Sequence, residues 1–178
     1  MKRTFFLLLF ILSTTVYAAE TLIGHGYEIN GFEVGAVYLQ PVTMAPTPAS
    51  SPQPSPFQAH LELDIHALKN NPYGFKVDEW IPYLTVNYEL QKLNPQGTPI
   101  TSQKGILLPM AANDGPHYGQ NVLFPGAGKY RLTYEILPPS IEGFLRHTDK
   151  ETGIPPWFKP IKAQWEFVFL GTGKKGGY

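Results

Sequence analysis

Apolar and polar residues alternate with a period of two along five separate segments of this chain. The segments lie at residues 32–40, 59–67, 82–91, 129–136 and 161–169. Because successive side chains of a β-strand point to opposite faces, this alternation predicts strands that each bury one face. The 17 Gly and 18 Pro residues fall mostly between these segments. We therefore predict an all-β fold, an immunoglobulin-like antiparallel β-sandwich without the cysteine pair of that class.

The first 18 residues have the three-part pattern of a secretory signal peptide. A basic MKR precedes the apolar run TFFLLLFIL, and VYA offers short residues to a signal peptidase. We predict cleavage after Ala18, one domain over residues 19–170 and a disordered tail over residues 171–178. The apolar run is too short for a membrane span, so no direct membrane insertion is expected. Residues 41–57 hold six prolines and are predicted to form an exposed, extended loop.

Cysteine is absent from the whole chain, which restricts the kinds of metal site it can build. Disulfides, blue-copper sites, cysteine zinc sites and iron–sulfur clusters are all excluded. A metal would have to bind His, Met, Asp, Glu, Tyr or backbone atoms. The 14 basic and 14 acidic residues balance, and no basic patch indicates a nucleic-acid partner.

The stretch HLELDIHA, residues 60–67, places its polar side chains on one face of a predicted strand. The other face is apolar throughout. A polar outer face of an antiparallel sheet is the ordinary interpretation of such a pattern. Ligands two residues apart can also converge on one ion, so a metal site is the alternative. The side chains concerned are two imidazoles and two carboxylates: His60, Glu62, Asp64 and His66.

A second group of candidate ligands lies in PMAANDGPHYG, residues 109–119. Met110, Asp114 and His117 surround a Gly-Pro turn that can fold His117 back toward Met110, the only thioether beside a His-bearing turn. A surface turn with a core methionine is the alternative. His147 lies in a polar loop, GFLRHTDKETG, and alone indicates little. As a set, thioether, imidazole and carboxylate donors suit copper, because thioether favours Cu(I) while carboxylate favours harder, more oxidised ions.

These stretches resemble the bacterial periplasmic iron-transport protein family, whose members bind copper and iron. DGPHYG and HLELDIHAL are the specific motifs, and VYLQPV, WIPYLTVNYEL and RHTDKETG extend the resemblance over roughly residues 23–170. The resemblance implies a carboxylate beside the copper at Glu62 and a further acidic residue at Asp114. It implies that the copper ligands are His60, Met110, His117 and His147.

The resemblance also implies the protein's setting. It suggests a periplasmic homodimer that works beside an inner-membrane iron permease, with copper and iron as its metals. His25 and His66 receive no role, and the Pro-rich loop departs from the family pattern. A metal-binding component of iron uptake is the favoured hypothesis. A copper-dependent redox enzyme, an oxidase or dismutase, is the alternative, and a structural immunoglobulin-like module that holds no metal is the third.

Overall fold

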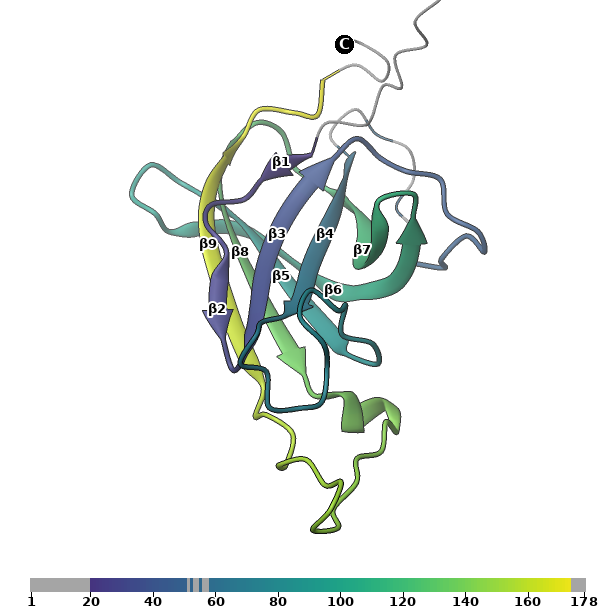
Figure 1. The fold of residues 1–178 in the computed structure, drawn as a ribbon. Coiled ribbons are helices and arrows are strands. Elements are labelled where there is room, and N and C mark those ends of the chain that lie inside the picture. Colours follow the sequence, from purple (N-terminus) through teal and green to yellow (C-terminus); the bar gives the residue numbers. More distant parts are fainter. Residues whose placement is uncertain (1–19, 51, 53–54, 56–57, 174–178) are drawn as a thin grey trace, which may run out of the picture.

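The structure is a computed structural model that describes residues 20–50, 52, 55 and 58–173 of the chain (Figure 1). Their regular structure consists of short and long β-strands and one 3₁₀ turn, η1. The elements are β1 (Thr21–Leu22), β2 (Tyr27–Ile29), β3 (Phe32–Leu39), β4 (Gln58–Ala67), β5 (Thr85–Leu93), β6 (Pro99–Ala112), β7 (Gly115–Leu123), β8 (Gly128–Leu137), η1 (Pro139–Glu142) and β9 (Ile161–Phe169).

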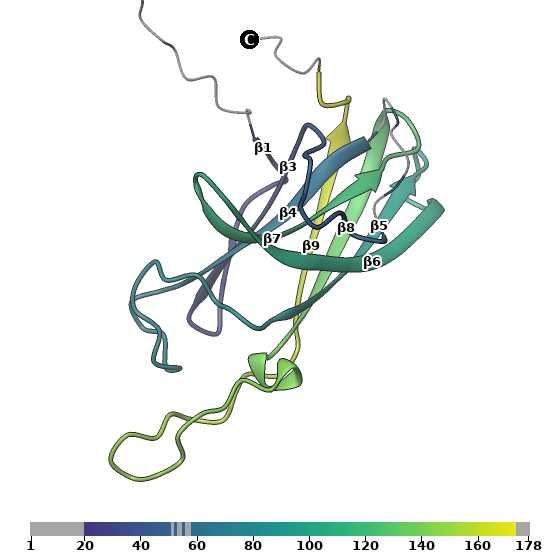
Figure 2. The ribbon, with the colours of Figure 1, turned by 90° about the vertical axis from the view of Figure 1, so that its right-hand side faces the viewer.

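The strands form two layers that are joined by the long strand β6. Hydrogen-bonded neighbours follow the order β1-β3-β4-β7-β6-β5-β8-β9, with β2 beside β3, and all pairs are antiparallel. Residues 99–107 of β6 pair with β5, whereas residues 108–112 pair with β7. Figure 2 shows β6 passing from one layer to the other. The predicted all-β antiparallel fold is confirmed, and the finer immunoglobulin-like assignment stays a prediction.

The core lies between the layers and fixes the orientation of β4. Leu61, Leu63 and Ile65 are fully buried there, as their alternation predicts. Burying a side chain of this size contributes about 1.5–3 kcal/mol, so reversing the faces of β4 would be costly. From β8, the buried Tyr134 hydroxyl also donates a hydrogen bond of 2.9 Å to the Glu62 carbonyl. His60 and Glu62 are thereby held on the opposite face of β4.

The hairpin of β6 and β7 folds His117 back toward Met110, as predicted for residues 109–119, and corrects only the position of the turn. Met110 and His117 lie on strands, directly paired across the hairpin, and the turn itself falls at residues 113–114. The sequence did not predict these strands because β6 is exposed on both faces along most of its length. β7 in turn buries polar side chains, so neither strand alternates as a half-buried strand does.

The segment from η1 to β9 projects from the lower end of the layers in Figure 1. Aromatic contacts support its base, where Phe144 stacks on Tyr83 with ring centroids 5.0 Å apart. None of the helical structure in the described residues is long and apolar enough to cross a bilayer. The predicted signal peptide lies outside the described residues. So does most of the predicted disordered tail, of which residues 171–173 have no regular structure.

Candidate metal centre

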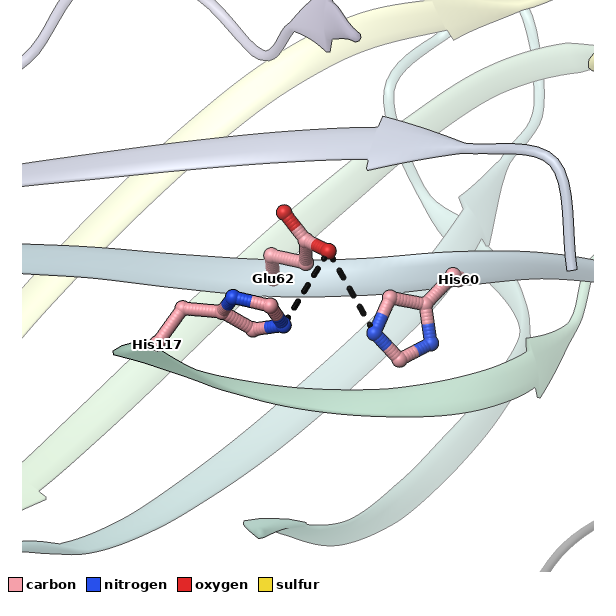
Figure 3. A group of neighbouring side chains, drawn as sticks. All are labelled: His60, Glu62 and His117. Carbon is pink, nitrogen blue, oxygen red and sulfur yellow. Dashed lines mark ion pairs between the residues drawn. The ribbon is translucent and has the colours of Figure 1, made fainter. Parts of the chain in front are cut away.

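Three side chains from two neighbouring strands converge on one point outside the core. His60 and Glu62 come from β4 and His117 from β7, and Figure 3 shows both imidazoles turned toward the carboxyl group. Glu62 Oε1 lies 3.4 Å from His60 Nε2 and 3.3 Å from His117 Nε2. All three donor atoms lie within 4.8 Å of one another, close enough to bind a single ion. All three residues are buried.

Asn121 determines which nitrogen of His60 faces this point. Its Oδ1 lies 3.0 Å from His60 Nδ1, and the Val42 backbone fixes the amide because Asn121 Nδ2 donates to the Val42 carbonyl at 2.8 Å. An acceptor at Nδ1 requires the proton on Nδ1, which leaves the Nε2 lone pair free. His60 Nε2 is buried and makes no hydrogen bond to any described residue. An unpaired buried nitrogen of this kind is costly unless a ligand meets it.

Gly119 leaves the space that the two imidazoles occupy. It lies on β7 two residues beyond His117, and a Cβ atom built there would come within 2.5 Å of His60 Nε2 and 3.3 Å of His117 Cδ2. Its backbone does not require glycine, since its φ is not positive. The demand for glycine at this position therefore comes from the close approach of His60.

Burial makes the cluster electrically neutral near pH 7. Desolvation lowers the pKa of His60 to about 4, against a smaller opposing effect of its Asn121 hydrogen bond, and it also lowers the pKa of His117. Desolvation, with the nearby charge of Asp64, raises the pKa of Glu62 to about 8. The imidazoles are thus unprotonated and the carboxyl is protonated. A cation bound beside Glu62 would favour the ionised carboxylate, whose negative charge would then offset that of the cation.

A cavity of about 1030 Å³ opens beside the cluster. His60, Glu62 and His117 line it, and Met110 of β6 and Asp114 of the hairpin turn form part of the same wall. The wall that completes the cavity comes from residues of the Pro-rich segment and from Glu20. The cavity thus adjoins the cluster, whose three side chains are themselves only 0–9% exposed.

The donors of this cavity fit copper. Two imidazoles with free lone pairs, one carboxyl group and an adjacent thioether form a mixed set that can accept either Cu(I) or Cu(II). The unpaired His60 Nε2 supports this assignment, because a preformed metal ligand lacks a protein partner at its ligating nitrogen.

The structure separates the predicted site residues into three groups. His60, Glu62 and His117 form the cluster, and Met110 and Asp114 lie in the cavity wall next to it. His147 is remote from both: it lies in the projecting segment, 74% exposed, with Nδ1 2.8 Å from Thr152 Oγ1.

The two unassigned histidines, His66 and His25, also lie outside the cluster and the cavity wall. His66 pairs through its backbone with Trp80, and the exposed His25 accepts a hydrogen bond from Trp165 through its carbonyl.

Three further residues of the site did not emerge from the sequence. Asn121 and Gly119 act on His60 across neighbouring strands, so only the register of β4 and β7 reveals them. Met44 also lines the cavity, although it does not lie beside a His-bearing turn as Met110 does. Its position in a Pro-rich stretch gave no signal, because such composition predicts an exposed loop.

Fold and site together define an all-β antiparallel protein with a buried imidazole–carboxylate centre that opens to a thioether-bearing cavity. Comparison with models of known protein families then identifies the family of this chain. The model of the Fe²⁺ transport protein family matches residues 17–171, and the chain belongs to this family.

Relatives of known sequence and structure agree with that membership. The UPF0423 protein of Brucella abortus strain 2308 is 49% identical over 164 residues, which cover 90% of this chain and 87% of the relative. Copper-reconstituted P19 from Campylobacter jejuni superposes with a TM-score of 0.80 at 45% identity, covering 88% of this chain and 99% of P19. FetP of uropathogenic Escherichia coli strain F11, recombinantly expressed in the periplasm of E. coli, gives 0.78 at 44% identity over 86% and 97% of the two chains.

Proposed function

We propose that this protein is a periplasmic, metal-binding component of iron uptake that holds copper in the His60–Glu62–His117 centre and assists delivery of iron to an inner-membrane permease. Membership of the Fe²⁺ transport protein family supports the link to iron. The copper in reconstituted P19, which is 45% identical, supports the choice of metal. The unpaired His60 Nε2, aimed at Glu62 inside a buried cluster, is the observation that carries the proposal.

Each residue of the centre has a distinct part in this function. His60 and His117 provide neutral nitrogen donors for either oxidation state of copper, which would supply a redox-active, Lewis-acidic centre. Met110 provides a soft donor that favours Cu(I). Glu62 provides a hard donor that favours Cu(II) or ferric iron, so we assign it as the ligand that engages in the oxidised state and is released in the reduced one.

Asp114 is assigned to the iron cargo rather than to the buried copper. It is exposed at the turn of the β6–β7 hairpin and borders the cavity. Its charge acts on Glu62, where it contributes to the raised pKa. An exposed carboxylate next to a shared ligand suits a cation that must arrive and leave quickly.

His147 completes the centre of a second copy in the predicted homodimer. In its own chain it is exposed and hydrogen-bonded to Thr152, away from the cavity. Two apolar side chains of the same segment, Leu145 and Ile141, are 87% and 59% exposed. Apolar side chains of this size on a projecting segment suit a contact with another protein surface. A dimer that buries them can carry His147 to the partner's cavity.

Metal analysis of variants tests the proposal. Protein purified from the native periplasm should contain about one copper per chain, and His60→Ala should lose it. His66→Ala is the matched control, since His66 lies on the same strand and face but outside the cluster. Copper retained by His60→Ala, or lost equally from His66→Ala, would contradict a centre at this point. Iron-limited growth of the same strains links the centre to uptake.

A further inference from the structure

Met44 lines the metal cavity from a segment in which no ligand was predicted. It lies between β3 and β4, and its side chain is half-buried, whereas those of its neighbours Thr43 and Ala45 are exposed. An apolar side chain in this proline-rich stretch is thus partly shielded from solvent. His60, whose Nε2 has no hydrogen-bond partner among the described residues, lines the same cavity.

The segment that carries Met44 is fixed to strand β7 at both ends. The Val42 amide donates to Asn121 Oδ1 at 3.3 Å, and Asn121 Nδ2 donates back to the Val42 carbonyl at 2.8 Å. Gln120 Nε2 donates to Ser50 Oγ at 2.5 Å. Since Asn121 also contacts His60 Nδ1, one side chain positions both the imidazole and the wall that bears Met44.

Two thioethers therefore line the cavity that the donor cluster also lines, one from β6 and one from the segment between β3 and β4. We propose that Met44 is a second thioether ligand of the centre and is specific for Cu(I). Thioether sulfur is soft and neutral, so it stabilises Cu(I) and contributes little to Cu(II), for which Glu62 is the better donor. The inference rests on the proposed copper function and adds a ligand that this function does not require.

Replacement by leucine separates ligation from packing. Met44→Leu retains the apolar volume and removes only the sulfur, because Leu and Met exchange with little cost in packing. Met44→Gln provides a second sulfur-free variant of similar length. Thr43→Val is the matched control: it changes a neighbouring wall residue and leaves both sulfurs in place.

The measurement is competition for copper under anaerobic, reducing conditions with the Cu(I) chelator bicinchoninate, followed by a parallel Cu(II) titration. Met44→Leu should weaken Cu(I) binding by about tenfold or more and Cu(II) binding by less than about twofold. X-ray absorption of the Cu(I)-loaded wild type should show two copper–sulfur contributions, and Met44→Leu or Met110→Leu should each leave one. Thr43→Val should match the wild type in all three measurements.

The possible outcomes distinguish this inference from the function on which it rests. Cu(I) affinity within twofold of wild type, with the sulfur contribution unchanged in Met44→Leu and Met44→Gln, overturns the role of Met44 while leaving the centre intact. Failure of the wild type to bind either oxidation state overturns the copper function itself. An equal loss of Cu(I) and Cu(II) affinity at unchanged thermal stability shows that Met44 only shapes the cavity, and also overturns the inference.

Discussion

His60 Nδ1 and Asn121 Oδ1 lie 3.0 Å apart, and this contact leaves His60 Nε2 as the free nitrogen of the centre. Asn121 can fill this role because its amide is oriented by the Val42 backbone on its other side. A ligating imidazole is commonly held in this way by an acceptor at its second nitrogen. The geometry of the centre therefore depends on a residue that does not ligate.

Replacing Asn121 should weaken copper binding without removing any ligand. Asn121→Leu keeps a similar volume but removes the acceptor at His60 Nδ1, so the tautomer and ring orientation are no longer fixed. We expect Cu(II) affinity to fall about 10- to 100-fold, as for other residues that support metal ligands. Asn71→Leu is the matched control, because it makes the same substitution at an amide that binds the Gly31 carbonyl and lies outside the cluster and its cavity. Similar affinities for both variants in a competition titration would show that Asn121 does not orient the ligand.

A methyl group at Gly119 should displace His60. Gly119→Ala would place a Cβ atom 2.5 Å from His60 Nε2, a separation that real structures do not tolerate. Copper stoichiometry should fall well below one per chain, and the thermal midpoint should drop by a few degrees through overpacking. Gly35→Ala on β3 is the matched control, since its nearest contact is 3.9 Å away. Full copper loading of Gly119→Ala would mean that the imidazole has room to move.

The sequence predicted the half-buried strands and the ligand-bearing face of β4, but not the surroundings of the ligands. Alternation identified β4 because Leu61 and Ile65 face the core while His60 and Glu62 do not. The same rule missed β6, which joins the two layers and buries neither face for most of its length. A periodic signal exists only where the two faces of a strand differ in polarity, as they do in β4, although its polar face is largely buried as well.

Contacts between distant segments account for the rest of the difference. Asn121 contacts His60 across the β4–β7 pairing, and Met44 reaches the cavity through a loop whose composition indicated only exposure. Neither contact has a local sequence pattern. His147 was named on family resemblance alone, and the position of its loop depends on how the segment after η1 packs rather than on residues near the motif.

Binding of Cu(II) should release a proton from Glu62. The pKa of Glu62 is about 8 in the metal-free protein, so the carboxyl is protonated at pH 7 and must ionise to bind the metal. The pKa of His60 is about 4, so this imidazole releases almost nothing at that pH. Calorimetry in two buffers of different ionisation enthalpy should give about one proton per copper at pH 7 and almost none at pH 9. Glu62→Gln should release close to none at either pH, and proton release that persists in this variant would assign the proton to another group.

The stability of the metal-free protein should fall as the pH rises through the same range. The pKa of Glu62 is raised from an ordinary value of 4.5 to about 8, so the folded state keeps a proton that the unfolded state releases. This stabilising contribution is complete below about pH 4.5 and is lost as the pH rises through 8. Urea midpoints should therefore decrease between pH 7 and 9 for the wild type and change less for Glu62→Gln. Parallel curves would show that Glu62 is ionised in the folded metal-free protein.

Mixing two inactive variants should restore copper binding if His147 acts in the partner's centre. His60→Ala and His147→Ala should each weaken copper binding as pure proteins. In a mixed dimer, the intact His60 of one chain meets the intact His147 of the other, so one of the two centres is complete. If both ligands act within one chain, neither chain of the mixed dimer has a complete set.

The measurement is copper titration after the two variants are unfolded and refolded together. If His147 acts in the partner's centre, the mixed fraction should have up to half of the wild-type tight sites. Refolding each variant alone is the control for incomplete recovery. No tight sites in a mixed dimer verified by mass would exclude His147 as a ligand supplied by the partner chain. A stable monomer that binds copper fully would show that the centre needs no partner chain.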